Sequence, residues 1–64
     1  MNTYYCVVET YDDRGRVTAA IVDSQDAEEQ PEDSFTSTTR KDIYVNWYDN
    51  YNTAAEAVEN AKRA

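Results

Sequence analysis

Two strand-forming segments joined by a short turn constrain the fold of this chain more than any other feature. Residues 3–11 are rich in Tyr and Val, and residues 17–22 are rich in β-branched residues; both compositions favour extended structure. Between them lies Asp12-Asp13-Arg14-Gly15. Asp is favoured at the first position of a type I turn and Gly at the fourth, where it can close a hairpin with a bulge. The sequence therefore predicts an antiparallel β-hairpin.

The register of this hairpin decides which side chains face the core. If Tyr11 lies opposite Arg16, one face carries almost wholly apolar pairs and the other is polar near the turn. The apolar face then pairs Thr10 with Val17, Val8 with Ala19 and Cys6 with Ile21. A slip of one residue would move every side chain to the other face, so the assignment of the core depends on the turn.

A third strand and a helix are predicted in the C-terminal part of the chain. Residues 42–48 alternate between apolar residues and residues dominated by tyrosine, which is a strand pattern. Residues 54–63 have small apolar residues at helical spacing, and Thr53 with Glu56 matches the T-x-x-E capping box of a helix start. The pattern leaves open whether the third strand lies beside the first or the second.

The predicted fold class is α+β, with one domain over residues 1–64, because a chain of 64 residues supplies only one core. A small three-stranded antiparallel or mixed sheet is made of the β-hairpin, a long acidic loop and the third strand, and the C-terminal helix packs on one face. The predicted core consists of Cys6, Val8, Val17, Ala19, Ile21, Val45, Trp47 and Val58.

An acidic segment separates the hairpin from the third strand. It contains six carboxylates and no basic residue, namely Asp23, Asp26, Glu28, Glu29, Glu32 and Asp33. Residues 23–39 lack strand or helix periodicity and include Pro31, so they are predicted to form a mobile acidic loop. Phe35 within this loop either anchors it to the core or faces a partner.

Composition excludes several classes of site. The chain has no His and one Cys, which rules out an intramolecular disulfide, a zinc site and a His-activated nucleophile. The acidic segment lacks both the spacing and the glycine of a calcium loop. No catalytic, cofactor-binding or metal-binding residue is predicted, and the chain is expected not to be an enzyme.

Charge and hydropathy limit the expected location and partners. Thirteen acids and six bases give a net charge of -7, which disfavours direct contact with nucleic acid and anionic membranes and favours basic protein surfaces. No segment is long and apolar enough to span a membrane, and no apolar leader is recognisable. A cytoplasmic, soluble protein is therefore expected.

Tyrosines are the most informative candidates for a binding surface. Tyr5 and Tyr11 of the first strand and Tyr44 and Tyr48 of the third are predicted to share the sheet face that points away from the helix. Tyrosine is enriched at interfaces, and uncovered apolar patches commonly mark protein contacts. These four residues are therefore the predicted partner-binding residues.

Two functional hypotheses follow. The first is a non-enzymatic protein-binding module that uses the tyrosine-lined face, with a second copy of the chain as one candidate partner. The second is an acidic inhibitor that displays carboxylates in place of phosphates and blocks a basic nucleic-acid-binding protein. In size and charge the chain is similar to the short anti-CRISPR and DNA-mimic proteins of phages and mobile elements, a likeness of composition without a shared motif. Only the second mode should weaken steeply with salt.

Overall fold

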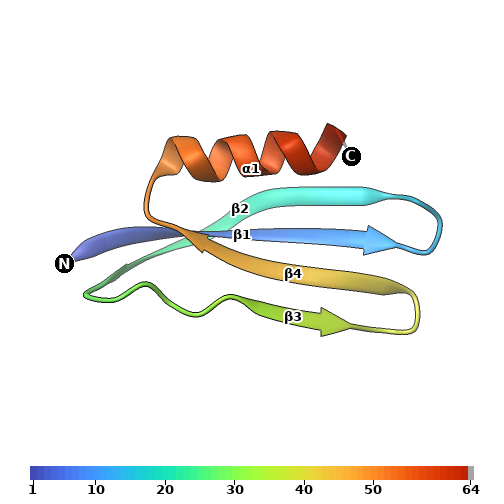
Figure 1. The fold of residues 1–64 in the computed structure, drawn as a ribbon, viewed down its shortest axis with the longest axis horizontal. Coiled ribbons are helices and arrows are strands. Elements are labelled where there is room, and N and C mark those ends of the chain that lie inside the picture. Colours follow the sequence, from blue (N-terminus) through green and yellow to red (C-terminus); the bar gives the residue numbers. More distant parts are fainter. Residues whose placement is uncertain (64) are drawn as a thin grey trace.

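A four-stranded antiparallel sheet and one helix make up the structure, a computed structural model that describes residues 1–63. The elements follow the order β1 (Asn2–Asp12), β2 (Val17–Ala27), β3 (Ser34–Ser37), β4 (Lys41–Tyr48) and α1 (Tyr51–Arg63) (Figure 1). Their order across the sheet is β2-β1-β4-β3. The α+β class with a C-terminal helix is confirmed, and the predicted third strand lies beside the first.

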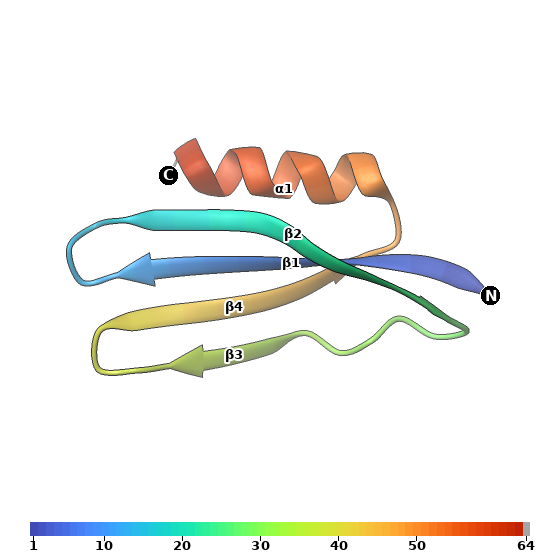
Figure 2. The same cartoon turned by 180° about the vertical axis from the view of Figure 1, so that it is seen from behind.

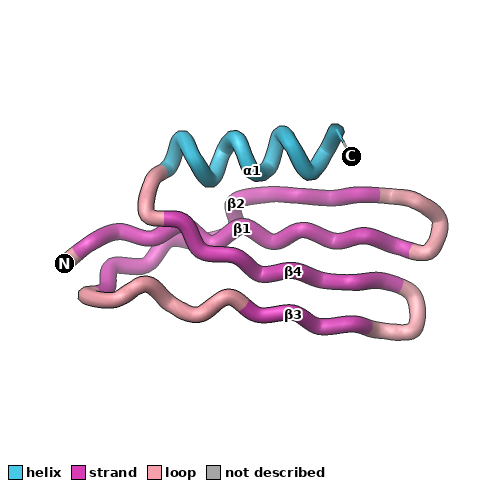
Figure 3. Tube along the Cα trace, in the orientation of Figure 1, coloured by secondary structure: helices cyan, strands magenta, loops and turns pink. Residues whose placement is uncertain are grey.

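The expectation of three strands is wrong, because the segment predicted as loop contains strand structure at both ends. β2 continues to Ala27, and Ser34–Ser37 forms the additional strand β3 on the free edge of β4. Every residue of β3 is exposed, so its polar sequence carries no burial pattern from which a strand could be predicted. Figure 3 shows the remaining connection, residues 28–33, returning beside the end of β4.

The hairpin forms as predicted, but its register differs by one residue. Asp12, not Tyr11, closes the turn, since its backbone N–H donates to the Arg16 carbonyl at 3.0 Å. Gly15 takes a positive φ of 82° and donates to the Asp12 carbonyl at 3.2 Å. The loop therefore holds three residues instead of four, and Tyr11 pairs with Val17.

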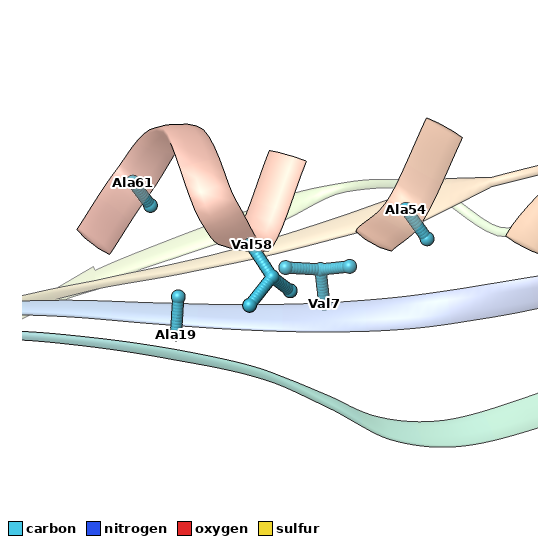
Figure 4. Close-up of a cluster of buried hydrophobic side chains, with 5 residues drawn as sticks. All are labelled: Val7, Ala19, Ala54, Val58 and Ala61. Atoms are coloured by element: carbon cyan, nitrogen blue, oxygen red, sulfur yellow. The ribbon is translucent and has the colours of Figure 1, made fainter. Parts of the chain in front are cut away.

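This shift exchanges the two faces of β1. Val7 is fully buried and joins Ala19, Ala54, Val58 and Ala61 in the core. Figure 4 shows Val7 and Val58 meeting between the sheet and the helix. The helix therefore covers the face of β1 that was predicted to be open, because a one-residue change of register moves every side chain of β1 to the other face relative to β2.

The predicted core is correct only in part. Ala19 and Val58 lie in it and Ile21 packs against it. Cys6 is buried on the opposite side of the sheet, in register with Trp47. The remaining predicted core residues, namely Val8, Val17, Val45 and Trp47, are only half-buried.

The side of the sheet away from α1 has no second helix to cover it within residues 1–63. We call its central part, formed by Val8, Thr10, Ala20, Ile43 and Val45, the bare face. In the view from behind, α1 runs along β2 and stays distant from β3 (Figure 2). The helix thus contacts β2, β1 and β4 on one face of the sheet and leaves β3 uncovered.

The helix begins earlier than the capping box predicts. Asn50 is its N-cap: the Oδ1 atom accepts hydrogen bonds from the N–H groups of Asn52 at 2.8 Å and Thr53 at 3.2 Å. Thr53 consequently lies inside the helix, where the T-x-x-E motif has no capping role. The sequence offers two possible N-caps, Asn50 and Thr53, because both residue types can accept hydrogen bonds from the unpaired N–H groups of a helix start. In the structure Asn50 is the cap.

Candidate functional site

The four predicted tyrosines lie on one face of the sheet, but it is the face that carries the helix. Tyr5 and Tyr48 are paired across β1 and β4 and pack against the core. Alternation along β1 places Glu9 and Tyr11, four and six positions after Tyr5, on the same face. The expectation that this face points away from the helix is wrong, for the same reason as the inverted register.

The structure separates these tyrosines into two pairs. Tyr5 and Tyr48 lie at the end of the sheet where α1 begins. There the rings of Tyr5 and Tyr51 meet edge to face, with their centroids 5.5 Å apart. Burial raises the pKa of Tyr48, and the charges of Glu9 and Asp33 raise it further. These two residues are therefore part of the support for the fold.

Tyr11 and Tyr44 instead meet on a part of the same face that α1 leaves uncovered. Their rings are perpendicular, with an interplanar angle of 86° and centroids 5.6 Å apart. Phe35 of β3, in register with Tyr44, adds a third ring at 4.8 Å. Phe35 is 54% exposed and Tyr44 39% exposed. We call Tyr11, Phe35 and Tyr44 the aromatic cluster.

A carboxylate adjoins the aromatic cluster. Glu9 Oε1 accepts a hydrogen bond from the Tyr11 hydroxyl at 3.0 Å, and Oε2 accepts one from Asn46 Nδ2 at 3.1 Å. Glu9, Tyr11, Tyr44 and Asn46 line an open hollow of about 250 Å³, which we call the Glu9 hollow. The hydrogen bond to Glu9, partial burial and the negative charge of Glu9 together raise the pKa of Tyr11.

Sequence reasoning missed Glu9 and Asn46 and left the role of Phe35 open. Glu9 could have been found from strand alternation, since it lies between Val7 and Tyr11 on one face. The position of Asn46 follows only from the pairing of β1 with β4, and that of Phe35 only from β3.

The acidic segment, residues 23–33, lies at the end of the sheet opposite the turn between β1 and β2. Asp23 and Asp26 belong to β2, and Asp26 Oδ1 accepts a hydrogen bond from the Thr3 hydroxyl at 2.7 Å. Asp33 Oδ1 accepts the backbone N–H of Trp47 at 2.8 Å, and Gln30 Nε2 donates to the Trp47 carbonyl at 2.8 Å. Glu28, Glu29 and Glu32 are exposed in the connection between β2 and β3.

Cys6 has the properties of a structural thiol. It is buried in β1, and burial raises the pKa of its thiol, which the carboxylates of Asp23 and Asp33 raise further. A raised pKa keeps the sulfur protonated and lowers its reactivity as a nucleophile.

Within residues 1–63, no three Cys, Asp or Glu side chains are grouped as metal ligands would be. The described part of the chain has no helix with the length and apolar character needed to cross a membrane. Comparison of the chain with protein-family models, with curated proteins and with solved structures finds no match.

Proposed function

We propose that this chain is a non-enzymatic protein-binding module whose contact surface is the aromatic cluster. The observation that carries the proposal is the mutual packing of Tyr11, Phe35 and Tyr44 on a part of the sheet that the helix does not cover. Aromatic side chains supply much of the binding energy of protein interfaces, because they bury a large area with few rotatable bonds.

The pairwise packing of the rings supports this role. Phe35 belongs to the edge strand and leans against Tyr44, so the cluster is ordered before a partner binds. Preordered side chains lose less conformational entropy on binding than mobile ones. A surface of this kind favours a partner that docks on β4 and β3.

Electrostatics favours a basic partner. The chain carries a net charge of -7, and Glu9 and Asp42 lie on the same face as the aromatic cluster. Long-range attraction accelerates association with a positively charged surface, while the aromatic contact resists salt.

The test is affinity capture from native cell extract at low and high salt, with wild-type and variant chains as bait. Phe35→Ser should lose the retained protein at both salt concentrations. Val22→Ser is the matched control, because Val22 is 59% exposed on β2, away from the cluster, while Phe35 is 54% exposed. Equal retention by wild type and Phe35→Ser would contradict the proposal.

The acidic inhibitor is the second candidate, and the hydrogen bonding of the acidic segment favours it. Mimicry of phosphates needs carboxylates held on a scaffold; Asp26 lies in a strand and Asp33 is bonded to β4. A variant with Asp26 and Asp33 changed to Asn, which keeps an acceptor oxygen at each position and removes the charge, separates the two candidates. Loss of a nucleic-acid-binding protein from this variant, with Phe35→Ser unaffected, would favour the inhibitor.

A further inference from the structure

We infer that the Glu9 hollow is a binding site for an organic cation, the ammonium of a Lys side chain or the guanidinium of an Arg side chain presented by a basic protein. This inference rests on the proposed function, since it names the group that the partner would insert beside the aromatic cluster. It depends on the geometry of the carboxylate, on the orientation of the two rings and on the charges that line the hollow.

The carboxylate of Glu9 is held in place from both sides. One oxygen accepts from the Tyr11 hydroxyl and the other from the Asn46 amide. A carboxylate has about four lone-pair sites, so two hydrogen bonds leave acceptor capacity on both oxygens. Glu9 is also half-buried, which strengthens its attraction for a cation compared with a fully solvated acid.

Tyr11 and Tyr44 form two walls at right angles. The interplanar angle of 86° means that the edge of one ring meets the face of the other, which leaves a corner between them. The face of an aromatic ring is negative, so a cation within about 6 Å of the ring centre is attracted to it. A carboxylate combined with ring faces selects a cation that also has apolar surface, as the Lys and Arg side chains do.

The hollow brings no cation of its own. Its lining among the described residues is Glu9, Tyr11, Tyr44 and Asn46, with no basic side chain. A different hollow lies beside the turn between β1 and β2 and the turn between β3 and β4. There Asp12 and Asp13 lie among four basic residues, so these two acids already have opposite charges nearby. The Glu9 hollow therefore has negative charge available for a partner.

The experiment titrates isotope-labelled protein with blocked amino acids and follows its amide and tyrosine ring resonances by NMR. The probes are N-acetyl-lysine N-methylamide, its trimethylated form and N-acetyl-arginine N-methylamide, and the uncharged control is N-acetyl-norleucine N-methylamide. We expect saturable shifts at the Asn46 side-chain amide and at the rings of Tyr11 and Tyr44 with the cationic probes only. The probe with the lowest dissociation constant identifies the preferred cation.

Variants test whether the lining residues cause the binding. Glu9→Gln keeps a hydrogen-bond acceptor but removes the charge, and should weaken the best probe by about tenfold. Tyr44→Leu should weaken it by about threefold. Glu59→Gln, which makes the same charge change at an exposed position of α1, should bind as wild type does. Equal shifts with norleucine, or equal weakening by Glu59→Gln, would overturn the inference.

Failure of this inference is distinguishable from failure of the proposed function. If Phe35→Ser loses the captured protein while Glu9→Gln retains it and no cationic probe binds, the aromatic contact stands and the cation site is wrong. If the probes bind but Phe35→Ser captures as wild type does, the site is correct and the aromatic cluster is not the main contact.

Discussion

Val7 and Val8 are neighbours in β1, and the sheet directs them to opposite faces. Val7 is 0% exposed beneath α1, whereas Val8 is half-buried on the bare face, opposite Ala20 and Val45. The adjacent valines are chemically identical, so their difference in burial depends only on which face the helix covers.

Alanine substitution at the two positions measures this difference. Val7→Ala should lower the free energy of unfolding by about 2 kcal/mol, because it removes two fully buried carbons and leaves a cavity. Val8→Ala should lower it by less than about 1 kcal/mol. Chemical denaturation of both variants provides the test, and a larger loss for Val8→Ala would mean that the helix packs on the other face.

Substitution of Asn50 by Ala should destabilise the fold, whereas substitution of Thr53 by Ala should not. Asn50 Oδ1 accepts two backbone N–H groups at the start of α1, so Asn50→Ala should lower the free energy of unfolding by about 1 kcal/mol. Thr53→Ala should change it by no more than a few tenths of a kcal/mol, since Ala is the better helix former. The comparison uses thermal unfolding, and the reverse order would restore Thr53 as the cap.

Gly15 is required for its backbone conformation and not for space. Its φ is +82°, and nothing lies within 4 Å of the position that a Cβ atom would occupy. Gly15→Ala should therefore lower the free energy of unfolding by about 1 kcal/mol through the left-handed conformation alone. Asn tolerates that conformation better than Ala, so Gly15→Asn should be less destabilising. Equal losses for both variants in a denaturant titration would contradict this account.

Ionisation of the Tyr11 hydroxyl should lower the free energy of unfolding at alkaline pH. The hydrogen bond to Glu9 raises the pKa of Tyr11 in the folded state, so the neutral phenol is favoured by folding. The neutral hydroxyl contributes its full stabilisation at pH values below the pKa of tyrosine in the unfolded chain, about 10. This contribution is lost as the pH rises through the higher pKa of Tyr11 in the folded state. Ring-labelled tyrosine followed by NMR should show a lower Tyr11 midpoint in Glu9→Gln than in wild type.

Tyr11→Phe serves as the control for that titration. This variant lacks the ionising hydroxyl, so the titration of the Tyr11 ring signal should disappear. The loss of stability at pH values above the pKa of tyrosine in the unfolded chain should also be smaller. An unchanged Tyr11 midpoint in Glu9→Gln would show that the carboxylate is not the cause of the shift.

Local sequence signals determined the hairpin, the strand at residues 41–48 and the C-terminal helix. Each depends on interactions between residues close in the chain: Asp12 and Gly15 form the turn, alternation defines β4, and small residues at helical spacing give α1 its buried stripe of Ala54, Val58 and Ala61. These features were predictable because the residues that cause them are neighbours in the sequence.

Tertiary structure alone decided the identity of the two faces and the contents of the candidate site. The turn closes on Asp12, and this one-residue choice places Val7 in the core and puts the tyrosine face under the helix. Strand β3 exists through its pairing with the edge of β4, and that pairing brings Phe35 to Tyr44. The turn sequence permits closure on Tyr11 or on Asp12, so the packing of β1 against the helix decides the register, whereas the edge pairing depends on contacts between different strands.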